Sequence, residues 1–221
     1  MRTAAVLPVK RFGRAKQRLD GAVGQPERAD LAAAMVGDVL AALRTIAEVD
    51  AIIVVTAEPR AQAAAREIGA RVVHDPVEAG QSDAAGRGLR AAVALGAERA
   101  LLVPGDCPAL DPAEVEGLLD AHPAAGVVIV PDRHGSGTNA LLLSPPRAIE
   151  PSFGPGSFAR HAARAAAAGV GVHVVQAASL ALDVDTPGDL AALRSALASL
   201  PDAAPRTRAL LERLARSPAP A

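Results

Sequence analysis

The sequence predicts an α/β fold whose central sheet is mostly parallel and is covered by helices on both faces. Short apolar runs alternate along the chain with longer stretches in which apolar residues recur at helical spacing. The apolar runs are continuous in Val, Ile and Leu, which is typical of strands buried on both faces. After Val130 a Gly-rich loop and two strands interrupt the alternation. This break indicates a small antiparallel excursion that builds a substrate pocket.

Each element follows from its local pattern, taken in chain order. Thr3–Val9 is the first apolar run, and a loop follows it at 19–24. Pro26 suits the first turn of a long helix, where Glu27 complements the positive end of the helix dipole. Later helices are expected to end at glycines. The predicted strands are 3–9, 51–55, 71–74, 100–103, 126–130, 140–143 and 172–175, and the later helices are 59–68, 82–95, 112–119, 158–168 and 187–197.

The length of 221 residues favours one domain, which we place at 1–197. Residues 198–221 are rich in Pro and Ala and carry a modest helical patch at 207–214. We therefore expect a partly helical tail that frays.

Composition argues against several classes of function, and a nucleic-acid role would require a local basic patch. Aromatic residues are 1% of the chain, so it lacks the stacking platforms of single-stranded nucleic-acid binders. The net charge of −1 gives no overall field for nucleic acid or anionic lipid. No apolar run at the N-terminus is long enough for a signal segment or a membrane span. The lone Cys107 fits a reducing compartment, so a cytoplasmic protein is expected.

A basic loop follows the first strand. Between Pro8 and Leu19 the chain places five cations where open α/β sheets bind ligands, namely Lys10, Arg11, Arg14, Lys16 and Arg18. Phosphates require such a set of cations and backbone donors. A solvated basic loop is the plain alternative. The spacing fits neither a Walker phosphate loop nor the glycine pattern of dinucleotide-binding dehydrogenases.

Three aspartates lie in positions that packing does not explain. Asp106 follows a buried strand in the segment Val-Pro-Gly-Asp-Cys-Pro, where a lone carboxylate is costly unless paired or bound to metal. Asp183 and Asp185 are spaced i, i+2 on an extended segment, so both point the same way and can share one Mg²⁺. A turn or helix-cap role is the alternative for Asp106, and a cap on the helix at Pro187 is the alternative for Asp185.

Two glycine-rich segments complete the candidate site. Residues 131–140 can offer backbone N–H groups to an anion, and residues 153–158 precede a helix, where donors lie at its positive end. Each can also be a plain turn. Cys107 is interpreted as a small buried filler, because no histidine arrangement goes with it. His134 and His161 are expected at the surface or in turns.

Five segments together resemble a known family. In chain order, VLPVKRFGRAKQRL, VPGDCPAL, VPDRHGSGTNALLLSPP, PSFGPGSFARH and SLALDVDTPGDL are similar to the 2-phospho-L-lactate or phosphoenolpyruvate guanylyltransferases of coenzyme F-420 biosynthesis. The resemblance runs from Thr3 to about Leu197, and its most specific part is PDRHGSGTNALLL. The other motifs alone also fit relatives of molybdenum-cofactor guanylyltransferase and sugar-nucleotide pyrophosphorylases.

The resemblance implies a Rossmann-like nucleotidyltransferase fold, GTP as co-substrate, Mg²⁺ as cofactor and a small phosphorylated acid as acceptor. Carried over by motif, the metal-binding residues are Asp106, Asp183 and Asp185. The acceptor contacts are Thr138, Gly154 and Ser157, and the phosphate-binding cations are Lys10, Lys16 and Arg18. One departure is the segment Gly80-Gln81-Ser82-Asp83-Ala84, where the family has a Gly-Leu-Asn-Ala-like stretch, so that Asp83 is a candidate to replace an amide contact to the nucleotide.

The chemistry suits these residues, because the acceptor phosphate is already an anionic nucleophile and requires no strong base. What the reaction requires is charge neutralisation and in-line placement. Phosphoenolpyruvate, 2-phospho-L-lactate and 3-phosphoglycerate remain open as acceptors, and a composition rich in Ala, Arg and Gly tilts the expectation to the first. The alternatives are a molybdenum-cofactor or sugar-nucleotide transferase and a non-catalytic nucleotide-binding regulator.

Overall fold

The computed structural model describes residues 1–19, 23–124 and 126–216. Its sheet has seven strands in the order β3-β2-β1-β4-β6-β5-β7. β6 pairs antiparallel with β4 and β5, and the other pairs are parallel. The strands are β1 Thr3–Val9, β2 Ala51–Thr56, β3 Arg71–His74, β4 Arg99–Leu102, β5 Gly126–Pro131, β6 Thr138–Ser144 and β7 Val172–Val174.

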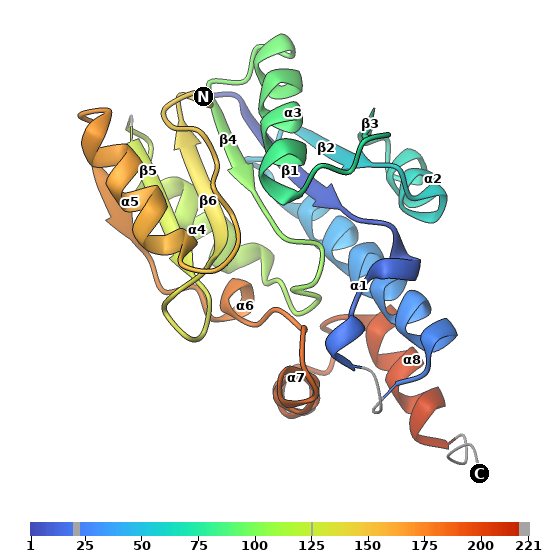
Figure 1. The fold of residues 1–221 in the computed structure, drawn as a ribbon. Coiled ribbons are helices and arrows are strands. Elements are labelled where there is room, and N and C mark those ends of the chain that lie inside the picture. The colour runs from blue at the N-terminus through green and yellow to red at the C-terminus, as the bar shows by residue number, and fades with distance from the viewer. Residues whose placement is uncertain (20–22, 125, 217–221) are drawn as a thin grey trace.

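Helices cover both faces of this sheet (Figure 1). One buried apolar cluster joins the sheet to α1, α2, α4 and α6, and a second joins its other face to α3 and α5. The helices are α1 Gln25–Thr45, α2 Pro59–Glu67, α3 Gln81–Ala94, α4 Pro112–Ala121, α5 Ser157–Ala167, α6 Ala178–Ala181, α7 Pro187–Ser199 and α8 Pro205–Arg216, with 3₁₀ turns at Phe12–Arg14 and Gln17–Leu19. The mostly parallel α/β sheet and its antiparallel excursion are therefore confirmed.

The C-terminal segment differs from the expectation that it frays. α8 packs along the lower half of α1 (Figure 1), and Leu210 and Leu211 are both 6% exposed. A third apolar cluster contains these leucines together with residues of α1 and α7. The tail is ordered because its helical patch carries an apolar face that buries against α1. Of the predicted tail, residues 217–221 lie outside the described ranges, as do residues 20–22 of the predicted loop.

One short helix, α6, was not predicted, because four residues give no readable helical period. Across the described part of the chain, no helix is long and apolar enough to cross a membrane.

Candidate active site

Segments with the predicted chemistry meet at one rim of the sheet. β1 and β4 are parallel neighbours, so the loops after Val9 and Leu102 leave from the same edge. β6 runs antiparallel to β4 and therefore starts at that edge, which brings Thr138 beside the two loops. Ligands of open α/β sheets bind at the carboxyl ends of the strands. The antiparallel strand thus adds its own first residues to this rim.

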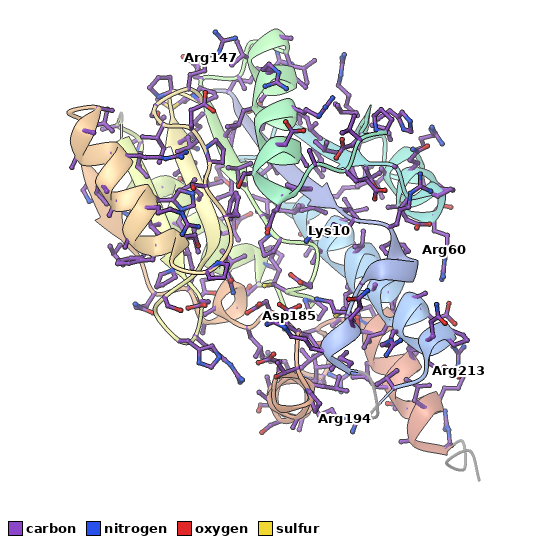
Figure 2. The ribbon with its side chains drawn as sticks, in the orientation of Figure 1. Lys10, Arg60, Arg147, Asp185, Arg194 and Arg213 are labelled. Carbon is purple, nitrogen blue, oxygen red and sulfur yellow. The ribbon has the colours of Figure 1, made fainter. Side chains whose placement is uncertain are left out.

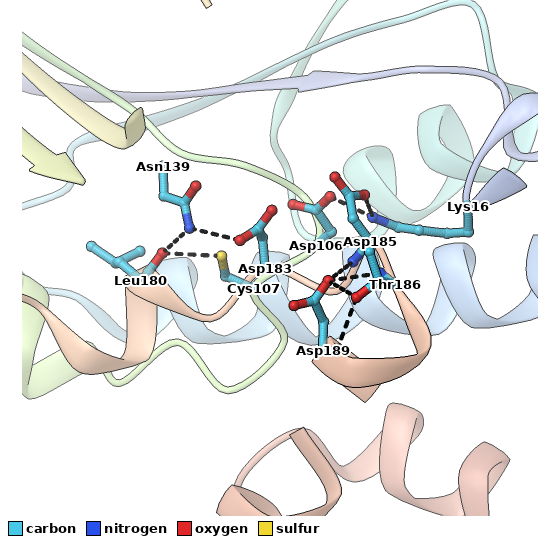
Figure 3. A network of polar contacts seen from close by, with 9 residues as sticks. All are labelled: Lys16, Asp106, Cys107, Asn139, Leu180, Asp183, Asp185, Thr186 and Asp189. Atoms are coloured by element: carbon cyan, nitrogen blue, oxygen red, sulfur yellow. Dashed lines mark hydrogen bonds and ion pairs between the residues drawn. The ribbon is translucent and has the colours of Figure 1, made fainter. Parts of the chain in front are cut away.

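Lys16 lies at the rim with its ammonium between two of the predicted carboxylates (Figure 3). Its Nζ donates to Asp106 Oδ2 at 2.5 Å and to Asp185 Oδ1 at 2.9 Å. Burial alone would lower the pKa of Lys16, but the two carboxylates outweigh it and raise that pKa above its usual range. The backbone of Lys16 has φ +57°, a sparsely populated conformation for a residue with a side chain. Lys16 is thus held as a cation over the rim.

Asp183 and Asp185 flank Val184, which is fully buried. Alternate residues of an extended segment point to opposite sides, so the burial of Val184 turns both carboxylates to the rim (Figure 3). The Val184 N–H donates to the Asp106 carbonyl at 3.2 Å, which holds the two segments side by side. Burial raises the pKa of Asp183, and the carboxylates of Asp106 and Asp185 add to this, against a hydrogen bond from Asn139. The three carboxylates therefore act on one another electrostatically.

The helix that follows is capped by Thr186 and Asp189, not by Asp185. The Thr186 side chain accepts from the Asp189 N–H, and Asp189 Oδ2 accepts from the Thr186 N–H at 2.7 Å, which forms a capping box. Asp189 Oδ1 forms an ion pair with Arg133 Nη2 at 2.5 Å. Burial works to raise the pKa of Asp189, but these hydrogen bonds and the guanidinium lower it below its usual range. Asp185 is free of the cap role and is available to the rim.

A cavity of about 310 Å³ opens beside the carboxylates and is lined by Lys10, Lys16, Asp106 and Asp185. Lys10, directly after β1, and Asp185, between α6 and α7, can be followed in Figure 2. The far wall of the cavity is the start of α3, where Gly80 and Gln81 contribute to the lining. Anions bind favourably at helix N-termini, so the cavity offers both a helix end and cations to phosphates. Arg18 is exposed and lies outside this lining, and its phosphate contact stays a prediction.

Asp83 does not belong to this lining either. Its Oδ2 forms an i, i+4 ion pair with Arg87 Nε at 2.8 Å on an exposed face of α3. The neighbouring Ser82 faces a different partner, because its Oγ accepts from the Phe153 N–H at 2.8 Å. Ser82 thereby joins the start of α3 to the second glycine-rich loop.

Of the three predicted acceptor contacts, Thr138 begins β6, Gly154 lies in the loop before α5, and Ser157 is the first residue of α5. Thr138 is 7% exposed and Ser157 is 1% exposed, so both side chains are buried without a ligand. Gly154 has φ +104°, which a residue with a side chain rarely adopts, and its N–H belongs to the loop that leads into α5. Their contact with an acceptor stays a prediction.

The expectation for His161 was wrong. His161 has no exposed surface, lies one turn into α5, and uses both ring nitrogens. It is hidden because it lies between Ser157 and Ala165, at one residue per turn, on the face of α5 that packs on the sheet. His134, in contrast, is exposed as expected and lies beside Arg133.

Whether this rim suits a metal ion depends on the side chains that lie there. Within the described ranges, no three or more His, Cys, Asp or Glu side chains are arranged to hold a metal ion. The donor set still has the right chemistry, since carboxylate oxygens are the ligands that Mg²⁺ prefers. The ammonium of Lys16 is the cation between Asp106 and Asp185. The three aspartates as Mg²⁺ ligands therefore stay a prediction.

The sequence analysis did not identify two residues that support the site, Asn139 and Arg133. Asn139 Nδ2 donates to Asp183 Oδ1 at 3.1 Å and to the Leu180 carbonyl at 2.9 Å, which orients the carboxylate (Figure 3). Arg133 holds the cap of α7 through Asp189. Both stand in the segment that carries the most specific resemblance, and the polar Asn139 within an apolar strand was the available signal.

Cys107 is a buried filler in the structure. Its thiol donates to the Leu180 carbonyl at 3.2 Å and has no exposed surface. Burial, followed by the nearby Asp106 and Asp183, raises the pKa of the thiol well above its usual value. A neutral, enclosed thiol is a poor nucleophile.

The sequence of this chain is similar to those of known proteins. The family model described as "Guanylyl transferase CofC like" matches residues 3–195. A protein of Conexibacter woesei named phosphoenolpyruvate guanylyltransferase is 50% identical over 219 residues, which is 98% of each chain. One of the same name from Sphaerobacter thermophilus is 40% identical and covers 86% of this chain and 91% of its own.

Solved structures show the same fold. A nucleotidyl transferase from Methanothermobacter thermautotroptrophicus matches with a TM-score of 0.64 at 23% identity, over 90% of this chain and 99% of its own. The fold is thus of the Rossmann-like nucleotidyltransferase type, as the resemblance implied. Because the family model matches every strand of the sheet and one relative is 50% identical over 98% of each chain, this chain belongs to the CofC-like guanylyl transferase family.

Proposed function

We propose that this chain transfers the guanylyl group of GTP to the phosphate of phosphoenolpyruvate and releases diphosphate, as a step of coenzyme F-420 biosynthesis in the cytoplasm. The observation that carries the proposal is the rim itself. Asp106, Asp185 and the buried ammonium of Lys16 line a cavity that also includes the start of α3. Asp183 interacts electrostatically with both of these aspartates. The names of the relatives support the choice of nucleotide and acceptor.

The reaction forms a bond between an acceptor phosphate oxygen and the α-phosphorus of GTP. The bond between that phosphorus and the oxygen bridging to the β-phosphate breaks, and the electron pair leaves with diphosphate. Charge repulsion between two polyanions is the main obstacle, so the site has to neutralise charge and align the reactants. Positioning of this kind is worth roughly 7–11 kcal/mol of barrier.

The residues of the chain divide these tasks. Lys10 and Lys16 approach the cavity from the basic loop and would neutralise the triphosphate. Asp106, Asp183 and Asp185 would hold Mg²⁺, which when bound supplies Lewis-acid stabilisation of charge on the transferred phosphoryl group. Thr138, Gly154 and Ser157 would bind the acceptor from the start of β6, the loop before α5 and the first turn of α5.

Lys16 has two tasks in this proposal. Without ligands its ammonium neutralises Asp106 and Asp185. When nucleotide and metal enter, Lys16 would leave the carboxylates for the phosphates, a small movement within one cavity. The exchange would keep both carboxylates paired with a cation at each stage.

A product assay tests the proposal. The protein is incubated with GTP, Mg²⁺ and phosphoenolpyruvate, 2-phospho-L-lactate or 3-phosphoglycerate in parallel, and diphosphate release and product mass are measured. Diphosphate release that depends on phosphoenolpyruvate, with the mass of its guanylyl adduct, is the expected result. Turnover only with another acid would change the acceptor, and GTP binding without turnover would favour a regulator.

A matched variant links the activity to the site. Asp106→Asn keeps the size of the side chain and removes its charge, so we expect turnover to be lost with the circular dichroism spectrum unchanged. ATP in place of GTP serves as the nucleotide control. A near-normal rate for Asp106→Asn would remove Asp106 from the reaction.

A further inference from the structure

His161 joins two segments that are far apart in the chain. Its Nε2 accepts a hydrogen bond from the Ser152 backbone N–H at 2.8 Å, on the loop before α5. Its Nδ1 lies 3.0 Å from Thr138 Oγ1, at the start of β6. A backbone N–H can only donate, so Nε2 must be the unprotonated nitrogen. Nδ1 therefore carries the proton and donates a hydrogen bond to the hydroxyl oxygen of Thr138.

The surroundings keep this imidazole neutral and in place. Burial lowers the pKa of His161 to about 4, and the neighbouring guanidiniums of Arg164 and Arg160 contribute to the decrease. The ring of Phe153 packs against it edge to face, with 5.2 Å between ring centroids. A neutral His with a proton on Nδ1 is the only form that satisfies both of its partners.

The loop itself is ordered by a different residue. The guanidinium of Arg160 donates to the carbonyls of Ser152 and Phe153, at 2.9 and 3.2 Å, and to that of Pro155. These contacts all lie within one loop. Arg160 therefore shapes the loop, whereas His161 connects the loop to β6.

We propose that His161 is a positioning residue for the acceptor, a brace that fixes the loop of Gly154, which leads into α5 at Ser157, against Thr138 and so sets affinity for the phosphorylated acid. The inference rests on the proposed function, since it takes these three residues as acceptor contacts. It follows from where the two hydrogen bonds end. One fixes β6 at Thr138 itself, and the other fixes the loop two residues before Gly154. Neither end reaches the nucleotide cavity, whose lining contains no residue of these two segments.

Two substitutions separate the two nitrogens of the ring. The amide nitrogen of His161→Asn falls near the position of Nδ1 and can still donate to Thr138, but the Ser152 N–H loses its partner. His161→Gln places an amide oxygen near Nε2, which keeps Ser152 and loses Thr138. Each variant loses one buried hydrogen bond, so we expect the KM for phosphoenolpyruvate to rise on the order of tenfold in each. The KM for GTP should stay within about twofold, because a selective loss of acceptor binding changes only that constant.

A double-mutant cycle tests whether His161 acts through Thr138. Thr138→Val has nearly the same shape and removes the hydroxyl. If the hydrogen bond carries the effect, the double variant of His161→Gln and Thr138→Val should lose little more affinity for the acceptor than Thr138→Val alone. Thr138→Ser, which keeps the hydroxyl, should retain most of the wild-type affinity.

The outcomes are distinct. Suppose that the wild type turns over but the His161 variants show equal rises in KM for GTP and for the acceptor, or that the effects in the cycle are additive. Either result would show a general packing role for His161 and would overturn the brace alone. Absence of wild-type turnover with every acid would overturn the proposed function and the brace together. Imidazole ¹⁵N spectra of the wild type give a check that requires no variant to fold. A proton on Nδ1 is expected, and a proton on Nε2 would refute the assignment.

Discussion

At the scale of single residues, Lys16 shows how a cation site can be formed before any metal is present. Its side chain is only 6% exposed, whereas Asp106 and Asp185 are 27% and 47% exposed. The lysine is therefore enclosed and the carboxylates face the cavity. Under the proposed function, Mg²⁺ would replace this ammonium on the same oxygens.

We expect Lys16→Gln to bind divalent cations more tightly than the wild type in the absence of nucleotide, because the competing ammonium is gone. Ion pairs whose carboxylates remain open to solvent are worth about 1 kcal/mol, so the gain should be roughly fivefold. Mn²⁺ titration followed by electron paramagnetic resonance measures it. Lys10→Gln is the matched control, since Lys10 lines the same cavity and is exposed. Equal or weaker binding by Lys16→Gln would mean that the carboxylates do not form the metal site.

The depressed pKa of His161 predicts how stability varies with pH. In the unfolded chain this group titrates near 6.5, and in the folded protein near 4. Between pH 6.5 and about 4, this imidazole binds a proton in the unfolded state and stays neutral in the folded state. The free energy of unfolding should therefore fall as the pH decreases from 6.5 to about 4, by up to about 3 kcal/mol from this group.

Urea unfolding between pH 7 and pH 4.5 measures this effect, with His161→Asn as reference. Carboxylates titrate in both proteins, so the difference between their two curves isolates the histidine. Parallel curves over this range would contradict the assignment of a buried neutral imidazole.

At the scale of elements, most of the fold could be predicted because apolar periodicity reports burial. The predicted strand 71–74 coincides with β3, and the predicted helix 59–68 differs from α2 by one residue. Cap assignments were harder to predict. Asp185 and Thr186 are adjacent and both suit a cap, and only the fold shows that Thr186 forms it with Asp189.

The site could be predicted in part for a related reason. The spacing of Asp183 and Asp185 gave their common direction, because alternation along an extended segment is a local property. The contact of Lys16 with Asp106 spans 90 residues, and the burial of His161 depends on how α5 packs on the sheet. Such contacts are set by the tertiary structure, and local pattern does not contain them.

The capping box of α7 should contribute measurably to stability, because it also holds Asp185 in place through the Asp185 N–H that donates to Asp189 Oδ2. Thr186→Ala should lower the free energy of unfolding by about 1 kcal/mol. Asp189→Ala should cost about 2–3 kcal/mol, since it also removes the partner of Arg133. Chemical denaturation measures both, and Thr186→Ser, which keeps the cap, is the control. Equal stability of Asp189→Ala and the wild type would contradict this account.

At the scale of the whole molecule, the rim and the C-terminal helix depend on the same long helix. α1 lines the cavity with Met35 and Val36. The same half of α1 also packs against α8. Asp38, which is 3% exposed, accepts from the backbone N–H groups of Arg206 and Thr207 at 3.1 and 2.8 Å. A carboxylate on α1 thus satisfies the first donors of α8, which suits the positive end of that helix.

Truncation after Leu200 is therefore expected to destabilise the domain and not merely to shorten it. It would expose the apolar face of α1 that Leu210 and Leu211 cover, and each leucine is worth roughly 1.5–3 kcal/mol. It would also leave Asp38 without its partners. Thermal unfolding should show a midpoint lowered by several degrees or more. Truncation after Arg216, which spares α8, is the matched control. A single substitution, Asp38→Ala, should reproduce part of the loss at about 1–2 kcal/mol. If removal of α8 left the unfolding midpoint unchanged, α8 would contribute nothing to the stability of the domain, and the sheet alone would hold α1 in place.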